Sequence, residues 1–421
     1  MRVLWLCNIM LPSVAAALGR NASNKEGWLT GLSGQLLCHG KENGIELGVC
    51  FPVEKDSEPV KGKVGEMSYF GFPEDTVHPE RYDADLEKHL SAILKEFTPD
   101  LVHIFGTEYP HTLAMTRCME NKEKILIGLQ GICSQCAESY MADLPKSVQN
   151  RFLLRDFLRQ DNIAQQKKKF VMRGSMETEA LKSVLHVTGR TAWDRELTAK
   201  INPNAEYHFL NETLRPSFYG PVWNKDACKK HSIFLSQGNY PLKGLHYLLQ
   251  AMPEILRQFP DTKAYVAGDK ITAFGTLKEK IKIGSYGKYC LDLIKTNGLE
   301  EKIIFLGRLD EKQMCEQYLK SNLFLSPSSL ENSPNSVGEA MLLGMPVVSS
   351  DVGGVASMLK NKTEGILYPH SDVQKLAEAV CTMFSKEEQA LQCGLQAREH
   401  ALKTHDPETN YHRLLTIYRE I

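Results

Sequence analysis

Two glutamates, Glu331 and Glu339, stand eight residues apart and are the first candidates for chemistry. Their surroundings predict a strand end, a loop, a helix that Ser333 caps and Pro334 begins, and a left-handed turn at Gly344. Such a loop at the carboxyl edge of a parallel sheet binds phosphate, because free N–H groups and the helix dipole favour negative charge. We expect Glu331 to accept hydrogen bonds from sugar hydroxyls and Glu339 to bind a ribose. By itself, the spacing also fits two ordinary glutamates.

A parallel sheet must position this loop and helix, and the rest of the chain predicts one. Short apolar, β-branched runs alternate with helix-length segments, the pattern of an α/β fold with helices on both faces of each sheet. We expect strands at 3–7, 46–51, 101–105, 125–129, 183–187, 207–210, 232–236, 263–267, 302–306, 323–326, 346–349 and 365–367. Two doubly wound domains follow, 1–220 and 221–404, and 405–421 forms a helix that packs on one of them.

The composition excludes several classes of protein. The 421 residues carry 50 Lys and Arg against 51 Asp and Glu, so no overall field would hold the chain on nucleic acid. Eleven cysteines, an odd number, do not suggest a disulfide framework and fit a reducing compartment. No run of ~18 apolar residues predicts a membrane span. The apolar start is similar to a signal peptide, but Asn8 and Pro12 interrupt it, so we favour a buried strand and a cytoplasmic protein.

One segment departs from the balanced charge. Residues 146–173 contain eight Lys and Arg against two Asp. Read as one helix, the segment places Arg151, Arg155 and Arg159 in a stripe beside apolar side chains. The two interpretations are a patch that contacts an anionic membrane or charged acceptor and a plain solvated helix face.

Four matches, in order along the chain, carry a family resemblance. They are Gly238 to Lys243-Gly244, the run 305–308 (FLGR), the 331–348 segment, and the run 351–354 (DVGG). Over about 232–367 the sequence resembles the retaining nucleotide-sugar glycosyltransferases of family 4. The resemblance implies a GT-B fold, in which two Rossmann-like domains enclose a cleft, with the donor site in the second domain and the acceptor site in the first. It also implies no cofactor and no metal, with a nucleoside diphosphate sugar as co-substrate.

The resemblance assigns roles within the second domain. Lys243 matches the lysine that neutralises the donor diphosphate, Glu331 the carboxylate beside the transferred sugar, and Glu339 the ribose ligand. The chemistry agrees, because a leaving diphosphate gains negative charge that a lysine and helix N–H groups stabilise.

Two departures from the family pattern concern the diphosphate. The family usually has an arginine where this chain has Gly238. Arg308 and Lys288 are our candidates to replace it, and the alternative for each is an ordinary surface charge. The family's glycine-rich loop contains Pro334 here, which has no N–H to donate, so Asn335 and Ser336 would have to bind the phosphates instead.

The first domain matches the family less closely. Gly27, in the run 24–28, is our candidate for the glycine turn that approaches the diphosphate. A histidine that many relatives carry two positions after His103 is Phe105 here, and we expect His103 itself to be a core residue. Glu108 and His111 follow the same strand and are our catalytic candidates for proton transfer from the acceptor, although either could be an ordinary polar loop residue.

The sequence therefore predicts a metal-independent, retaining, cytoplasmic glycosyltransferase. It would move a sugar to a hydroxyl of a glycan or lipid-linked acceptor, as in polysaccharide biosynthesis. Two alternatives remain: a nucleotide-sugar epimerase or hydrolase of the same fold, and a nucleotide-sugar-binding protein without catalysis.

Overall fold

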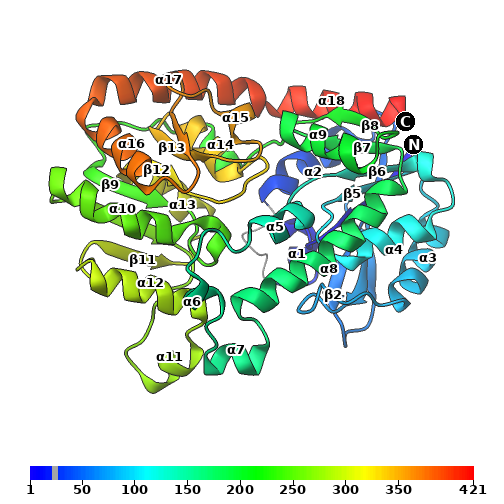
Figure 1. Cartoon of the computed structure of the whole chain (residues 1–421). Helices are drawn as coiled ribbons and strands as arrows, with labels where there is room; N and C mark the ends of the chain where they lie inside the picture. Colours follow the sequence, from blue (N-terminus) through cyan, green and yellow to red (C-terminus); the bar gives the residue numbers. More distant parts are fainter. Residues whose placement is uncertain (21–26) are drawn as a thin grey trace. The chain divides into compact units, whose positions relative to one another are not determined.

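The alternating apolar runs form two separate, mainly parallel sheets (Figure 1). The computed structural model describes residues 1–20 and 27–421. The first sheet has eight strands in the order β3-β4-β2-β1-β5-β6-β7-β8, and all its neighbours are parallel except β3 and β4. The second has six parallel strands in the order β11-β10-β9-β12-β13-β14. The predicted α/β fold class is confirmed.

The chain divides into two compact units whose bounds differ from the predicted domains. Unit 1 comprises Met1–Ala137, Lys169–Arg215 and Thr404–Ile421, and unit 2 comprises Glu138–Lys168 and Pro216–Lys403. The assignment of all of 1–220 to one domain is therefore wrong for 138–168. The side chains of this segment bond to the second sheet's helices, as in the hydrogen bond of Ser285 to Asp156.

The elements of unit 1, with helices α5 and α8 that cross its boundary, are β1 (Arg2–Cys7), α1 (Pro12–Ala17), α2 (Gly27–His39), β2 (Glu46–Glu54), β3 (Val60–Val64), β4 (Met67–Glu74), α3 (Asp85–Phe97), β5 (Leu101–Phe105), α4 (Pro110–Cys118), η1 (Lys122–Lys124), β6 (Ile125–Gly128), α5 (Cys133–Ser139), α8 (Ile163–Lys182), β7 (His186–Gly189), α9 (Ala192–Ile201), β8 (Glu206–Phe209) and α18 (Pro407–Glu420).

Those of unit 2 are α6 (Lys146–Gln149), α7 (Leu154–Arg159), η2 (Pro216–Phe218), β9 (Lys229–Leu235), η3 (Pro241–Lys243), α10 (Leu245–Gln258), β10 (Lys263–Ala267), α11 (Leu277–Lys282), α12 (Ser285–Thr296), β11 (Ile303–Gly307), α13 (Glu311–Lys320), β12 (Ser321–Ser326), α14 (Asn335–Leu343), β13 (Val347–Asp351), α15 (Val355–Met358), β14 (Ile366–Pro369), α16 (Val373–Ser385) and α17 (Glu387–Thr404).

Strand β1 explains why the first sheet is covered on both faces. Its apolar residues are consecutive, and successive side chains of a strand point to opposite faces. Trp5 belongs to a core formed with α2 and α18, whereas Leu4 and Leu6 belong to a core formed with α3, α4 and α8. Residues 2–7 therefore form the expected buried strand.

The C-terminal helix α18 packs on unit 1. The hydroxyl of Tyr418 accepts a hydrogen bond from Trp5 Nε1 at 2.8 Å and lies 2.7 Å from Nδ1 of His103, so three elements distant in sequence share one buried polar contact. Within the described part of the chain, no helix combines the length and apolar character needed to cross a membrane.

Candidate functional site

The predicted donor residues lie where the strand order of the second sheet reverses. Strands β9 and β12 are neighbours, and the chain continues from β9 to β10 on one side and from β12 to β13 on the other. Loops after two such strands diverge and leave room for a ligand at the carboxyl edge of the sheet. Lys243 follows β9 and Glu331 follows β12.

Lys243 and Glu331 contact each other directly. The Nζ of Lys243 donates a hydrogen bond to Oε1 of Glu331 at 2.6 Å, and the hydroxyl of Ser328 donates to the same oxygen at 2.7 Å. The two charged side chains are 22% and 12% exposed. The pair is thus partly buried. Partial burial makes its electrostatic interactions stronger than those of a pair at an open surface.

Backbone contacts fix this pair. Gly244 has φ +69°, and a Cβ there would lie 1.8 Å from the carbonyl oxygen of Pro327, so only glycine permits this approach. The N–H of Ser329 donates to the carbonyl of Leu242 at 2.8 Å. The loop after β12 is thereby tied to the segment that carries Lys243.

The motif at 351–354 meets the same loop from its other side. The N–H of Gly354 donates to the carbonyl oxygen of Glu331 at 3.0 Å. A Cβ on Gly353, whose φ is +52°, would lie 2.1 Å from that oxygen. Two of the four motifs thus contact the loop that carries Glu331.

The helix after Glu331 is α14, and its start differs in detail from the prediction. Pro334 is the N-cap residue and the helix begins at Asn335. The prediction that Ser333 caps the helix is wrong, because its hydroxyl contacts the sulfur of Met358 at 3.2 Å. The predicted left-handed end at Gly344 is confirmed by its φ of +73°.

The N–H groups of Asn335 and Ser336 belong to the first turn of α14, ahead of the helical ladder. The first bonds of that ladder are donated by Val337 and Gly338 to the carbonyl of Pro334. The first turn therefore presents donors at the end of the loop that carries Glu331, as an anion site requires.

Glu339 lies in the second turn of α14 and is 4% exposed. The hydroxyl of Tyr318 is 3.5 Å from its Oε2 and 3.0 Å from the carbonyl oxygen of Ser336. The predicted ribose ligand is therefore oriented by a tyrosine of α13.

The structure also places the three residues that concern the missing arginine. Gly238 is buried, and a Cβ there would lie 3.0 Å from Val266 and 3.2 Å from Leu245, so the position is crowded. The guanidinium of Arg308 makes two hydrogen bonds of 2.9 Å to Asp269, which raise the pKa of the arginine. Lys288 pairs with Asp292. Both proposed replacements thus hold carboxylate partners.

A cavity of about 870 Å³ lies in unit 2 beside Arg308. Its lining includes Arg155, Arg159, Asn239, Tyr240, Asp269 and Arg308. Asn239 and Tyr240 belong to the same short segment as Lys243. One loop therefore contributes both to the cavity lining and to the candidate diphosphate site. Arg155 and Arg159 come from 138–168, which the sequence had assigned to the other domain.

In unit 1, Glu108 and His111 lie in one hydrogen-bonded network. His111 is fully buried, with Nδ1 2.6 Å from Glu74 and Nε2 2.9 Å from the side-chain oxygen of Asn8. The amide nitrogen of Asn8 donates to Glu108 at 2.8 Å. The backbone N–H of Gly131 donates to the other oxygen of Glu108 at 2.8 Å.

This network also lies where a strand order reverses, between β1 and β5. Asn8 directly follows β1, Glu108 and His111 follow β5, and Glu74 ends β4. Sequence reasoning missed Asn8 and Glu74. The only sequence signal for each was a polar residue at the end of an apolar strand. Strand β4, which ends at Glu74, was not predicted.

The remaining predicted residues of unit 1 have simpler positions. His103 is fully buried in β5, and burial lowers its pKa from 6.5 to about 3, as suits a neutral core residue. Its ring centroid lies 3.9 Å from that of Phe105. Gly27 is the first residue of α2, and residues 24–26 of its predicted turn lie outside the described part of the chain.

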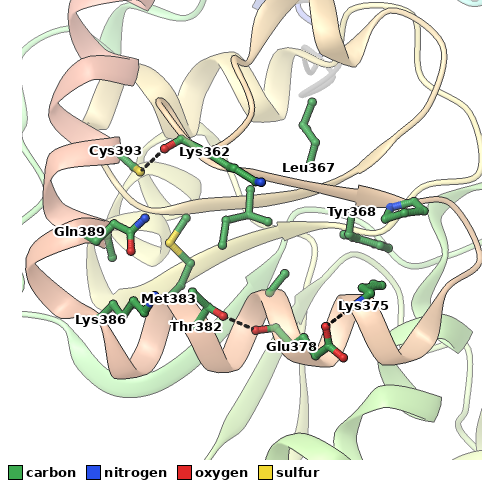
Figure 2. A pocket seen from close by; sticks show the side chains of 14 residues that line it. Lys362, Leu367, Tyr368, Lys375, Glu378, Thr382, Met383, Lys386, Gln389 and Cys393 are labelled. Carbon is green, nitrogen blue, oxygen red and sulfur yellow. Dashed lines mark hydrogen bonds and ion pairs between the residues drawn. The ribbon is translucent and has the colours of Figure 1, made fainter.

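Two other features lie apart from these residues. A hollow of about 350 Å³ between β14, α16 and α17 is lined by side chains such as Leu367, Tyr368 and Met383, and its Lys375 and Glu378 pair with each other (Figure 2). His186, Glu206 and His208 form a set able to ligate a cation. His186 and Glu206 begin strands β7 and β8, whose carboxyl ends share an edge of the sheet with the end of β5 before Glu108, and His208 lies within β8. Neither contains a predicted site residue.

Comparison with known proteins assigns part of the chain to a family. Residues 222–400 match the model of the glycosyl transferases group 1. An uncharacterized glycosyltransferase of Methanocaldococcus jannaschii is 31% identical over 142 residues, which are 34% of this chain and 32% of that protein. The D-inositol 3-phosphate glycosyltransferase of Corynebacterium urealyticum is 26% identical over 183 residues, 43% of this chain and 41% of that one. The matches thus span less than half of these relatives.

Solved structures match over the whole chain at low identity. The sucrose-phosphate synthase of Thermosynechococcus elongatus has a TM-score of 0.72 at 15% identity and covers 100% of this chain and 99% of its own. Anabaena HepE in complex with UDP has a TM-score of 0.66 at 15% identity, with 100% of both chains covered. These likenesses show a shared GT-B fold.

Proposed function

Since residues 222–400 match the glycosyl transferases group 1 family, we propose that the chain transfers a sugar from a nucleoside diphosphate to a hydroxyl of an acceptor with retention of configuration. The observation that carries the proposal is the contact of Lys243 with Glu331 at the point where the strand order of the second sheet reverses.

In this proposal the donor's diphosphate binds Lys243 and the first turn of α14. A breaking glycosidic bond leaves negative charge on the diphosphate, and a preorganised ammonium and helix N–H groups stabilise that charge without reorganising. Glu331 accepts hydrogen bonds from the sugar's hydroxyls, and Glu339 accepts them from the ribose. A metal ion is not required by this scheme, because the lysine and the helix provide the positive charge.

The network of unit 1 is our candidate for the acceptor side. Glu108 would accept the proton of the acceptor hydroxyl, and Asn8 and His111 would hold its carboxylate in place. We assign no covalent nucleophile. The proposed acceptor is a glycan or a lipid-linked acceptor, as in polysaccharide biosynthesis. The proposed location is the cytoplasm, with membrane contact through part of 146–173.

A thermal-shift screen with nucleoside diphosphates and their sugars tests the donor. A ligand at 100 times its Kd adds about 2.7 kcal/mol of apparent stability. The solved complexes of HepE with UDP and with UDP-glucose make uridine diphosphate sugars the first to test. No stabilisation by any nucleoside diphosphate or its sugars would refute the proposed donor site.

A second experiment tests the reaction. Incubation of a bound donor with an acceptor panel, followed by NMR of the product, should show transfer with the anomeric configuration of the donor. Rapid conversion of the donor without acceptor would instead indicate an epimerase or hydrolase. Binding without any product would indicate a nucleotide-sugar-binding protein.

A further inference from the structure

Helices α7 and α11 expose an unusual set of apolar side chains. The two helices contact each other within unit 2 (Figure 1). The guanidinium of Arg155 in α7 lies against Gly284, two residues after α11. We call the solvent-facing side of this pair the α7–α11 face. Its exposed apolar residues are Phe152, Leu154, Phe157, Leu158, Leu277 and Ile281, each 48–79% exposed.

The structure changes what the basic segment 146–173 can offer. The segment is not one helix, because α6, α7 and the start of α8 divide it. Two of the three stripe arginines have carboxylate partners: Arg151 pairs with Asp292 and Arg155 with Asp161. A plain solvated stripe of arginines is therefore not what this surface presents. Its exposed side chains include four large apolar ones, Phe152, Leu154, Phe157 and Leu158.

Positive charge surrounds these apolar side chains. Helices α7 and α11 together carry five Lys and Arg and two acids. Both acids are engaged within the protein. Asp156 is buried, and Glu279 accepts hydrogen bonds from the N–H groups of Gly275 and Thr276 at 2.8 Å. Arg159 and Lys282 are exposed beside Leu158 and Ile281.

We propose that the α7–α11 face binds the surface of an anionic membrane. Apolar side chains flanked by lysine and arginine enter the boundary between head groups and acyl chains, while the cations meet anionic head groups. A second copy of the chain is a poorer occupant, because it would bring the same positive charges together. The sequence alone did not point to α11, which lies outside 146–173.

The face is connected to the large cavity of unit 2. Leu158 and Ile281 line both the face and the cavity, together with Arg159 and Lys282. Membrane contact would therefore bring the polar lining of the cavity within reach of lipid head groups.

Vesicle co-sedimentation of the full chain tests the proposal. The wild type should sediment with vesicles of phosphatidylcholine and phosphatidylglycerol, and at least about tenfold less with phosphatidylcholine alone. Phe157→Ser/Leu158→Ser in α7 and Leu277→Ser/Ile281→Ser in α11 should each reduce binding at least about tenfold. Lys278→Gln/Lys282→Gln should reduce it at low salt and less at high salt, where charge attraction is screened.

The matched control is Val77→Ser/Leu395→Ser, which removes apolar side chains that are 78% and 45% exposed elsewhere on the chain. It should bind vesicles like the wild type, and every variant should keep the wild-type melting temperature. Wild-type sedimentation by the α11 variant would overturn the proposal, as would absence of binding by the wild type. A wild-type dimer in analytical ultracentrifugation that the same variants dissociate would assign the face to self-association instead.

Discussion

The ammonium of Lys243 and the carboxylate of Glu331 lie 2.6 Å apart although 88 residues separate them in sequence. The contact joins the loops after two neighbouring strands, β9 and β12. A diphosphate bound at Lys243 would compete with Glu331 for the same ammonium. Donor binding would then release the carboxylate toward the sugar, which gives both residues a role in one event.

Removal of either charge should slow the reaction strongly. Glu331→Ala and Lys243→Ala are each expected to lower kcat about 100-fold or more, because each removes a charged group from a partly buried site. The measurement is initial-rate kinetics with the donor found in the thermal-shift screen. Lys225→Ala and Glu388→Ala, which disrupt a more exposed pair of the same 2.6 Å length in unit 2, are the controls and should leave kcat unchanged. Near wild-type turnover in either site variant would remove that residue from the mechanism.

The two residues should differ in nucleoside diphosphate binding. Lys243→Gln is expected to raise the Kd at least about tenfold, because a charge-assisted contact to phosphate is lost. Glu331→Gln should leave the Kd unchanged or lower it, because the competing carboxylate charge is gone. Isothermal titration calorimetry measures both. Equal weakening by both substitutions would contradict the proposed division of roles.

Gly244→Ala should cost more than a left-handed backbone alone explains. The new Cβ would lie 1.8 Å from the carbonyl oxygen of Pro327, so the loop must move and take Lys243 with it. We expect a loss of more than about 3 kcal/mol in the free energy of unfolding, and a loss of donor binding. Urea denaturation and calorimetry provide the two values.

Gly298→Ala is the matched control for that change. Gly298 has φ +61°, also lies in unit 2, and has open space where its Cβ would be. The substitution should cost about 1 kcal/mol through backbone strain and leave donor binding intact. Equal costs at the two positions would show that the approach to Pro327 does not constrain the site.

Glu74 and His111 should be coupled in stability. Both are buried, and Nδ1 of His111 lies 2.6 Å from Oε2 of Glu74. Removal of one side chain therefore leaves the other without this partner. We expect each alanine substitution to cost about 1–3 kcal/mol and the double substitution to cost less than their sum. The exposed pair Glu408 and His412, at 3.8 Å, should show additive effects in the same double-mutant cycle. Additivity at Glu74 and His111 would argue against their interaction.

His103 should make unit 1 less stable in acid. Burial lowers its pKa from 6.5 to about 3, so between these values the unfolded chain takes up a proton that the folded chain does not. Stability is therefore lost as the pH falls from 6.5, by up to about 1.4 kcal/mol per pH unit. Urea titrations followed by tryptophan fluorescence include a probe of this region, because the ring centroids of Trp5 and His103 are 6.2 Å apart. His103→Phe should flatten the pH dependence, and the exposed His412→Gln should not.

Much of the second unit could be predicted from sequence because its signals are local. Apolar β-branched runs gave β9 to β14 within a few residues, and Gly344 ends α14 as expected. The order of the motifs around Lys243 and Glu331 also carried information that each motif lacked alone. Contacts that depend on side-chain packing were harder, as the sulfur contact of Ser333 shows.

The first unit was less predictable because its site depends on long-range pairing. Glu74 is positioned by the parallel pairing of β4 with β2, in which it pairs with Glu54, and no local pattern marked β4. Segment 138–168 was misassigned for the same reason. Its place in unit 2 depends on contacts such as that of Asp156 with Ser285, which are 129 residues apart in sequence.

The passage of 138–168 into unit 2 also limits how this protein can be divided. The backbone changes units at 137/138, 168/169, 215/216 and 403/404. A single protease cut between 215 and 216 would leave the two units still linked through the other three backbone crossings. A fragment limited to 216–403 would lack the residues that cover Ser285 and line the large cavity. A chimera that exchanges residues 222–400 with a relative must therefore also exchange the 138–168 segment to fold well.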